Sequence, residues 1–214
     1  IRVFDGTVDW ELTRVPHNGT LTTNETAIFS MLLVGSTIYL TTKDGTSGDG
    51  ANRTGRVFAL DPSSGALTQI GNQWTTTYQP YCLAWHMGRL WAGSMDVSGG
   101  VANLGYVSYF RPGIDTDWTT DRTLAQGTGG GVSFLYSFQG QLFAGNWTGT
   151  GTSAVVEVRS SVGSWSASLT VSVGTQSIFM NAVEFGGALY VTLFDQTGSV
   201  STVRKFDGSS WSTV

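Results

Sequence analysis

Apolar and polar residues alternate along most of this chain in short runs, and glycine, aspartate and serine separate the runs. The stretch 181–214 shows the pattern most clearly: three apolar runs each end at turn residues, and a last short run begins at Trp211. Within 188–194, leucine, valine and leucine occupy every second position. A period of two that is bounded by turn residues is typical of strands joined by hairpins. The stretch therefore predicts a four-stranded antiparallel meander.

The same unit recurs upstream of this stretch. In each copy an aromatic residue follows a glycine turn, at Tyr39, Trp91, Phe143 and Tyr190, with spacings of 52, 52 and 47 residues. Repeats of about 50 residues with four strands each are typical of propeller blades, because one blade cannot bury both of its faces and must pack on neighbours. A β-sandwich or a β-solenoid is the alternative. We therefore predict an all-β fold, a β-propeller of four-stranded antiparallel blades.

The repeat divides a single domain into about four and a half blades. They are expected at residues 1–14 (partial), 15–71, 72–122, 123–169 and 170–214. The partial blade carries Phe4-Asp5-Gly6 before Trp10, as the last blade carries Phe206-Asp207-Gly208 before Trp211. A half blade leaves an unpaired edge, so we expect upstream sequence or another chain to complete it and a full propeller of five or more blades. Alternatively, the first residues pair with a neighbouring blade.

The last hairpin carries a family resemblance. The stretch 203–211, in which Phe206-Asp207-Gly208 precedes Trp211, resembles the end of a kelch-type blade. It also resembles, more loosely, the Asp-box turn of sialidase-like propellers. The resemblance implies propeller architecture, and architecture alone carries no activity with it.

Composition narrows the possible partners and location. Charged residues make up 12% of the 214 residues, the net charge is −4, and Lys43 and Lys205 are the only lysines. Without a basic cluster, nucleic acid and anionic membranes are poor partners, and no apolar run reaches the about 18 residues that span a bilayer. A surface rich in threonine, serine, glycine and asparagine favours an extracellular, secreted or virion-surface protein. The single cysteine, Cys82, is expected to be a small buried apolar residue.

The longer predicted loops gather on one face of the propeller. In this fold the connections between second and third strands lie on the same face as the connections between blades, and long loops on one face are a common binding surface. Aromatic rings beside carboxylate and amide groups suit a sugar, whose apolar face stacks while its hydroxyls form hydrogen bonds. The candidate ligand-binding residues are Asp44, Asp49, Asn52, Trp74, Tyr78, Asp96, Asn146, Trp147, Asp195 and Gln196. Alternatively, Trp74 and Tyr78 only cover blade edges.

Metal binding and cofactors receive little support. Oxygen ligands for calcium could come from Asp44, Asp49 and Asn52 in a glycine-rich loop. This loop lacks the spacing and the bidentate glutamate of an EF-hand, so an ordinary surface loop is favoured. Two histidines and one cysteine give no zinc pattern, and His86 is expected to be a strand-end residue with its hydrogen bonds satisfied. We expect no cofactor.

Four Asn-x-Thr sequons mark possible glycosylation sites. They begin at Asn18, Asn24, Asn52 and Asn146, all in predicted surface loops. A used sequon must be exposed, and an occupied one would indicate a secretory route. The alternative is that the sequons are a by-product of a threonine-rich surface.

Catalysis is the competing class of function. A glycosidase propeller needs carboxylates that converge on the central axis, which the first strand of each blade would line. In those predicted strands Glu184 is the only acidic residue, and no Gly-x-Ser-x-Gly motif occurs in the chain. We therefore predict a protein without catalytic residues: a non-enzymatic, lectin-like or receptor-binding module for a glycan or protein receptor. The alternatives are a purely structural subunit of a larger assembly, such as a phage tail or capsid decoration, and a glycoside hydrolase of propeller fold.

Overall fold

The computed structural model describes residues 25–44, 55–72, 74, 78–96, 104–125, 130–148, 153–161, 163–173, 177–195 and 200–214. Within these ranges the chain forms sixteen β-strands and no helix. It follows that no described helix could cross a membrane. The half blade predicted at residues 1–14 lies outside the described part of the chain.

The strands form four consecutive blades, each an antiparallel meander in chain order. Blade I consists of β1 (Glu25–Val34), β2 (Thr37–Asp44), β3 (Val57–Leu60) and β4 (Leu67–Ile70). Blade II consists of β5 (Tyr78–His86), β6 (Arg89–Asp96), β7 (Leu104–Phe110) and β8 (Thr119–Ala125). Blade III consists of β9 (Gly131–Phe138), β10 (Gln141–Thr148), β11 (Ser153–Arg159) and β12 (Trp165–Ser172). Blade IV consists of β13 (Ser177–Phe185), β14 (Ala188–Asp195), β15 (Val200–Phe206) and β16 (Trp211–Thr213).

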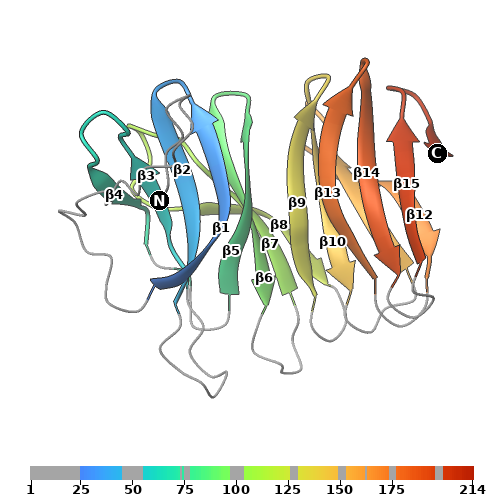
Figure 1. Ribbon diagram of the computed structural model, residues 1–214, viewed down its shortest axis with the longest axis horizontal. Helices are drawn as coiled ribbons and strands as arrows, with labels where there is room; N and C mark the ends of the chain where they lie inside the picture. The colour runs from blue at the N-terminus through green and yellow to red at the C-terminus, as the bar shows by residue number, and fades with distance from the viewer. Residues whose placement is uncertain are drawn as a thin grey trace, which may run out of the picture.

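The blades stand side by side, with their first strands on one side of the molecule. Figure 1 shows β1, β5, β9 and β13 in a row at the front, with the later strands of blades II and III behind them and those of blades I and IV spreading to either side. The prediction of an all-β propeller built from four-stranded antiparallel blades is confirmed.

Tight turns join the first and second strands at one end of the blades, which we call the tight-turn end. In the turns Met87-Gly88, Gln139-Gly140 and Gly186-Gly187 both residues have positive φ. Two-residue turns of this kind match the right-handed twist of the flanking strands. The opposite end, where each second strand ends, we call the long-loop end.

A repeated tryptophan ties neighbouring blades together. It stands at or just before the start of the fourth strand, and its indole N–H donates to the fourth strand of the preceding blade. The three bonds run from Trp118 to the Ile70 carbonyl (3.0 Å), from Trp165 to Asp121 Oδ2 (2.6 Å) and from Trp211 to Ser168 Oγ (3.0 Å). The tryptophan repeat visible in the sequence is thus a contact between blades.

Apolar seams fill the space between the blades. The aromatic residue in the third position of the second strand is buried in blades I to III, at Tyr39, Trp91 and Phe143. The seam between blades III and IV is a cluster of phenylalanines: Phe134, Phe138, Phe143, Phe179 and Phe206. Each buried aromatic side chain removes a large apolar area from water, which is the main source of cohesion between the blades.

The blades also touch through the backbone near the long-loop end. Met95 of β6 pairs with Gly131 of β9, and Trp147 of β10 pairs with Ile178 of β13. A Cβ atom on Gly131 would lie 2.7 Å from the Cα atom of Met95, so only glycine fits there.

Candidate functional site

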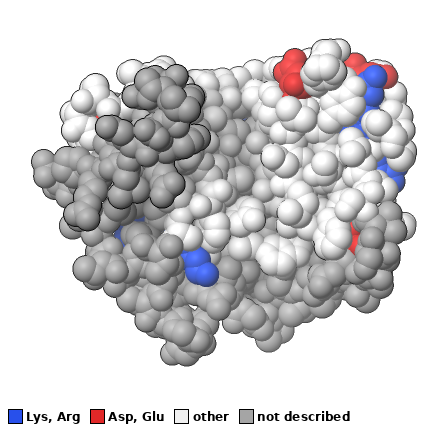
Figure 2. All heavy atoms as spheres, viewed as in Figure 1, with Lys and Arg blue, Asp and Glu red and all other residues white. Residues whose placement is uncertain are grey.

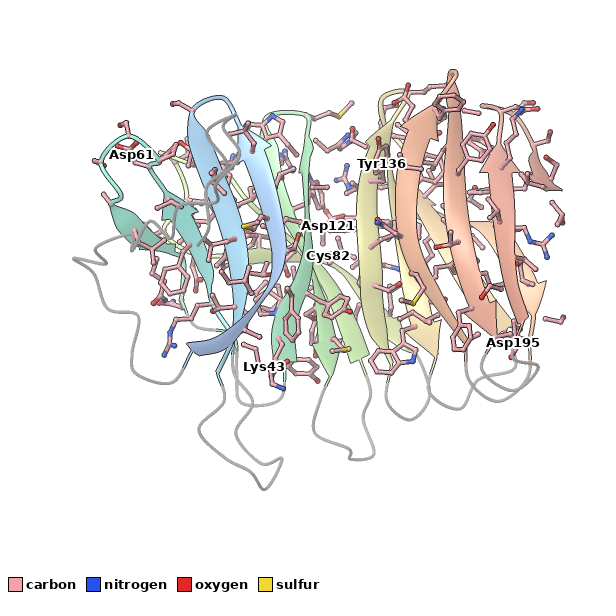
Figure 3. The ribbon with its side chains drawn as sticks, in the orientation of Figure 1. Lys43, Asp61, Cys82, Asp121, Tyr136 and Asp195 are labelled. Carbon is pink, nitrogen blue, oxygen red and sulfur yellow. The ribbon has the colours of Figure 1, made fainter. Side chains whose placement is uncertain are left out.

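Three of the predicted binding residues occupy one repeated position at the long-loop end. Asp44, Asp96 and Asp195 are each the last residue of the second strand of their blade, and Thr148 takes that place in blade III. Figure 3 shows Asp195 at the lower edge of the blades, the same edge as Lys43. The backbone thus brings three aspartates to the same end of the blades, although the side chains of two of them, in blades I and II, lie outside the described part of the chain.

The prediction that Asn146 and Trp147 lie in a surface loop is wrong. Both belong to β10, where they pair with Val132 and Gly131 of β9, and Trp147 also pairs with Ile178 of the next blade. Asn146 is 4% exposed, and its Oδ1 accepts a hydrogen bond of 2.7 Å from the Val155 N–H. A buried amide that takes part in strand pairing cannot carry a glycan in the folded protein, so the sequon at this position is not a surface site.

The other predicted positions divide into two groups. Residues outside the described part of the chain are Asn18, Asn24, Asp49, Asn52 and Gln196. Trp74 and Tyr78 are described, and the structure brings them together. Among the described side chains no group of three histidine, cysteine, aspartate or glutamate residues could hold a metal ion.

Trp74 and Tyr78 line a cavity of about 380 Å³ beside the seam between blades I and II, which we call the aromatic cavity. Its lining residues are Asn72, Trp74, Tyr78, Tyr106, Ser108, Asp117, Trp118 and Thr120. Only two of these eight were singled out as binding residues from the sequence. The others belong to strands and hairpins that the repeat pattern explains as architecture.

Two aromatic pairs form the walls of the aromatic cavity. The ring centroids of Trp74 and Trp118 lie 5.7 Å apart at an interplanar angle of 56°, and those of Tyr78 and Tyr106 lie 4.6 Å apart at 77°. The Tyr106 hydroxyl lies 3.4 Å from that of Tyr78. The half-buried Trp74 has an indole N–H that is itself buried and has no hydrogen-bond partner in the described part of the chain. A buried donor of this kind is an available contact for a ligand oxygen.

A fixed carboxylate borders the same cavity. Asp117 Oδ1 accepts hydrogen bonds from the backbone N–H groups of Asn72 (2.9 Å) and Trp118 (2.8 Å), and its Oδ2 accepts one from Asn72 Nδ2 (2.6 Å). Partial burial raises the pKa of the Asp117 carboxyl, but these hydrogen bonds outweigh it and the pKa is lowered overall. Asp117 is therefore ionised at neutral pH and held in place.

Acidic groups on the front of the molecule are few. Glu184, the acid that the sequence places on a first strand, is exposed near the tight-turn end of β13, and its backbone N–H donates to the Tyr136 hydroxyl (3.1 Å). Figure 2 shows this face largely without charged side chains among the described residues, with most of the acidic ones near the upper edge. Glu184 and the aspartates of the long-loop end thus lie at opposite ends of the blades.

Comparison with known proteins places this fold. No protein-family model and no curated protein matches the chain. A protein of unknown function from Dyadobacter fermentans shares the fold with a TM-score of 0.59 and 14% identity, over 89% of this chain and 69% of that one. The GH43B protein of a Bacteroides ovatus xyloglucan locus has a TM-score of 0.55 and 12% identity, over 89% of this chain and 41% of that one. An α-L-arabinofuranosidase from Fusarium graminearum has a TM-score of 0.57 and 11% identity, over 87% of this chain and 66% of that one. This chain thus spans between two fifths and about two thirds of their lengths.

These comparisons contradict the expectation that the protein is not an enzyme. The solved structures that share its fold include glycoside hydrolases, so the shortage of acids on the first strands does not exclude catalysis. At these identities the likeness shows the fold and assigns no catalytic residue in this chain. The virion, kelch-like and glycoprotein interpretations gain no support and stay predictions.

Proposed function

We propose that this protein is a carbohydrate-active β-propeller that binds a saccharide in the aromatic cavity and hydrolyses a glycosidic bond. The observation that carries the proposal is the combination of two aromatic pairs with the buried, unpartnered Trp74 indole N–H in one cavity. Aromatic rings present flat apolar surfaces to sugar rings, and an indole N–H donates to a hydroxyl or ring oxygen. The volume of about 380 Å³ is within the range of small-molecule sites.

The polar lining suits sugar hydroxyls. Asp117 accepts hydrogen bonds, while Ser108 and Thr120 can donate or accept them. The hydrogen bond between the two hydroxyls is long, with 3.3 Å between Ser108 Oγ and Thr120 Oγ1. A saccharide would therefore find hydrogen-bond donors and acceptors in the same lining as the aromatic rings.

Hydrolysis requires a pair of carboxyl groups, one of which starts as the proton donor. Asp117 does not suit the donor role, because its lowered pKa keeps it ionised. Asp96 is the better candidate by position: it pairs with Tyr78 in the β5–β6 ladder, so its backbone adjoins the aromatic cavity. Asp195 occupies the same repeat position in blade IV.

The first experiment is a binding screen against soluble oligosaccharides, followed by calorimetry and a reducing-end assay on those that bind. Trp74→Ala should weaken binding by at least about tenfold, because one stacking wall and a buried donor are lost together. The matched control is Trp147→Ala, which removes an indole from β10, outside the cavity, and should leave affinity within about twofold. Equal losses in both variants, or saccharide binding that Trp74→Ala does not change, would place the site elsewhere.

The reaction is tested separately from binding. Asp96→Asn should retain saccharide binding and lose turnover at least about a hundredfold, as expected for a general acid or base. Bound saccharides that are never cleaved by the wild-type protein would remove the hydrolase part of the proposal and leave the binding site standing. An extracellular location fits a polysaccharide ligand and is part of the proposal.

A further inference from the structure

The four blades can be compared position by position because their strand ladders match. The last residue of the first strand is Val34, His86, Phe138 and Phe185 in blades I to IV. The last residue of the third strand is Leu60, Phe110, Arg159 and Phe206. The first residue of the second strand is Thr37, Arg89, Gln141 and Ala188. At the first two positions a single blade has a basic side chain where the others have apolar ones, and at the third a single blade is charged.

These three departures from the repeat meet at one place. His86 and Arg89 of blade II and Arg159 of blade III line a cavity of about 280 Å³ at the tight-turn end, together with Trp91, Ser161 and Gly163. We call it the cationic cavity. The three basic residues come from two blades, so neither the repeat nor closeness in sequence explains why they line one cavity.

Arg159 is held firmly although it is charged. Its side chain is 12% exposed, and its Nε and Nη2 donate to the two oxygens of Asp121 at 2.8 and 3.2 Å. Its guanidinium carbon also lies 5.0 Å from the ring of Trp91. Figure 3 shows Asp121 near the middle of the view, behind the gap between β5 and β9. Such an arginine keeps its orientation without a ligand.

Positive charge at the cavity exceeds negative charge. The Arg89 guanidinium lies over the ring of Tyr109, 4.5 Å from its centroid, and forms no ion pair in the described part of the chain. Two carboxylates, Asp115 and Asp121, are close enough to attract the Arg89 guanidinium, but each forms an ion pair with another arginine. One guanidinium charge therefore remains without a paired carboxylate among the described residues.

His86 provides an unused polar atom beside these charges. It is 3% exposed, its Nδ1 lies 2.9 Å from Ser137 Oγ, and its buried Nε2 has no hydrogen-bond partner among the described residues. The sequence prediction of a fully satisfied strand-end histidine is therefore wrong for one of its two nitrogens. When the Ser137 hydroxyl donates to Nδ1, Nε2 carries the hydrogen and can donate it to a ligand. A buried polar atom without a partner is unfavourable, so a ligand oxygen there would be stabilising.

Glycine keeps the guanidinium of Arg159 in place at the rim. Gly163 has a φ of +89°, and a Cβ atom there would lie 3.0 Å from Arg159 Nη2. Any other residue would be strained and would press on the arginine.

We propose that the cationic cavity binds a small oxyanion, a carboxylate or phosphate group carried by a soluble molecule. Arg89 and Arg159 would supply the charge, and His86 Nε2 a neutral donor. Guanidinium groups match the paired oxygens of both anions. The site is independent of the saccharide proposal, because it lies in another seam and shares no lining residue with the aromatic cavity.

The test follows the imidazole C–H signals of His86 by NMR, since the chain has only two histidines and His86→Gln assigns the signal. Sodium phosphate, sodium glucuronate and glucose are titrated at constant pH and ionic strength. We expect a saturable shift with phosphate, with glucuronate or with both, and none with glucose; the two anion arms distinguish a phosphate from a carboxylate ligand.

Two variants make the result specific. Arg89→Gln should weaken anion binding by at least about tenfold, since a charged donor is lost. The control is Lys205→Gln, which also removes one positive charge and a contact with an aromatic ring, here Tyr190 in blade IV, and should leave binding unchanged. Thermal unfolding checks that both variants fold. The absence of a saturable shift with both anions, or equal binding in Arg89→Gln and wild type, would overturn the proposal.

Discussion

The seam between blades II and III and the seam between blades III and IV are built on the same repeat, and both hold apolar clusters, but among the described residues ion pairs are found only in the first. Phenylalanines fill the second of these seams, with Phe143 packing on Phe206 at a centroid distance of 5.4 Å, and no ion pair crosses it among the described residues. Two ion pairs cross the first seam, Arg159–Asp121 at 2.8 Å and Arg122–Glu157 at 2.9 Å.

The difference separates cohesion from function. Apolar contacts between blades give stability without directional requirements. A partly buried ion pair loses much of its attraction to desolvation and is seldom more stabilising than an apolar pair of the same volume. A repeat that places arginine and histidine where other blades place leucine, valine and phenylalanine has therefore given up apolar contacts at that seam, and the cationic cavity is what lies there.

The largest expected effect comes from the apolar seam. Phe143 is fully buried, and Phe143→Ala should lower the free energy of unfolding by about 3–5 kcal/mol, as for buried aromatic truncations generally. Phe185→Ala is the matched control, since that side chain is 75% exposed and its loss should cost less than about 0.5 kcal/mol. Chemical denaturation measures both. Similar losses in the two variants would mean that the phenylalanine seam is not the source of cohesion.

The sequence predicted the blades well because the repeat is local. Alternation, turn residues and the recurring aromatic are all readable within about 50 residues, and the tryptophan before the fourth strand could be placed. The end of β10 could not be predicted, because Asn146 and Trp147 look like a polar loop. Both pair with β9 of their own blade, and Trp147 also pairs with β13 of the next blade. Pairing with neighbouring strands overrides local propensity there.

The candidate sites were less predictable than the fold. Trp74 and Tyr78 were found by residue type. Trp118 and Asp117 were not among the sequence candidates, because only tertiary contacts bring them beside Trp74 and Tyr78. The cationic cavity does leave a signal in the repeat, since aligning the strand ends of the blades reveals Arg159 as the departure from an apolar position. Its meeting with basic residues of blade II required the structure.

An intermediate effect is expected from the polar seam. Asp121→Asn leaves Arg159 without its carboxylate and weakens the acceptor of the Trp165 indole. Because both charged side chains are 12–15% exposed, we expect a loss of about 2–3 kcal/mol, below the range for fully buried pairs. Asp115→Asn is the control, since its partner Arg111 is 44% exposed and water screens the pair, and it should lower stability clearly less than Asp121→Asn.

Acid should remove the same stabilisation. Burial raises the pKa of Asp121, but hydrogen bonds from Arg159 and Trp165 together with the nearby arginine charges outweigh it, so its folded pKa lies below the ordinary value of 3.8. The contribution is then complete above the unfolded pKa and is lost as the pH falls through the folded one. The stability difference between wild type and Asp121→Asn should therefore be constant near neutral pH and shrink below about pH 4. A difference that persists in acid would assign the effect to shape and not to charge.

The smallest effect distinguishes the two ion pairs of the polar seam. Arg122 is 40% exposed, so its pair with Glu157 is screened by water and should contribute at most about 1 kcal/mol. A double-mutant cycle with Arg122→Gln and Glu157→Gln measures the coupling directly. Coupling at this level would mean that the exposed Arg122–Glu157 pair adds little to this seam. The partly buried Arg159–Asp121 pair beside the cationic cavity would then be what distinguishes it from the phenylalanine seam. Coupling well above 2 kcal/mol would instead make the whole seam an electrostatic joint, and Arg122 would then belong with the residues that hold blades II and III together.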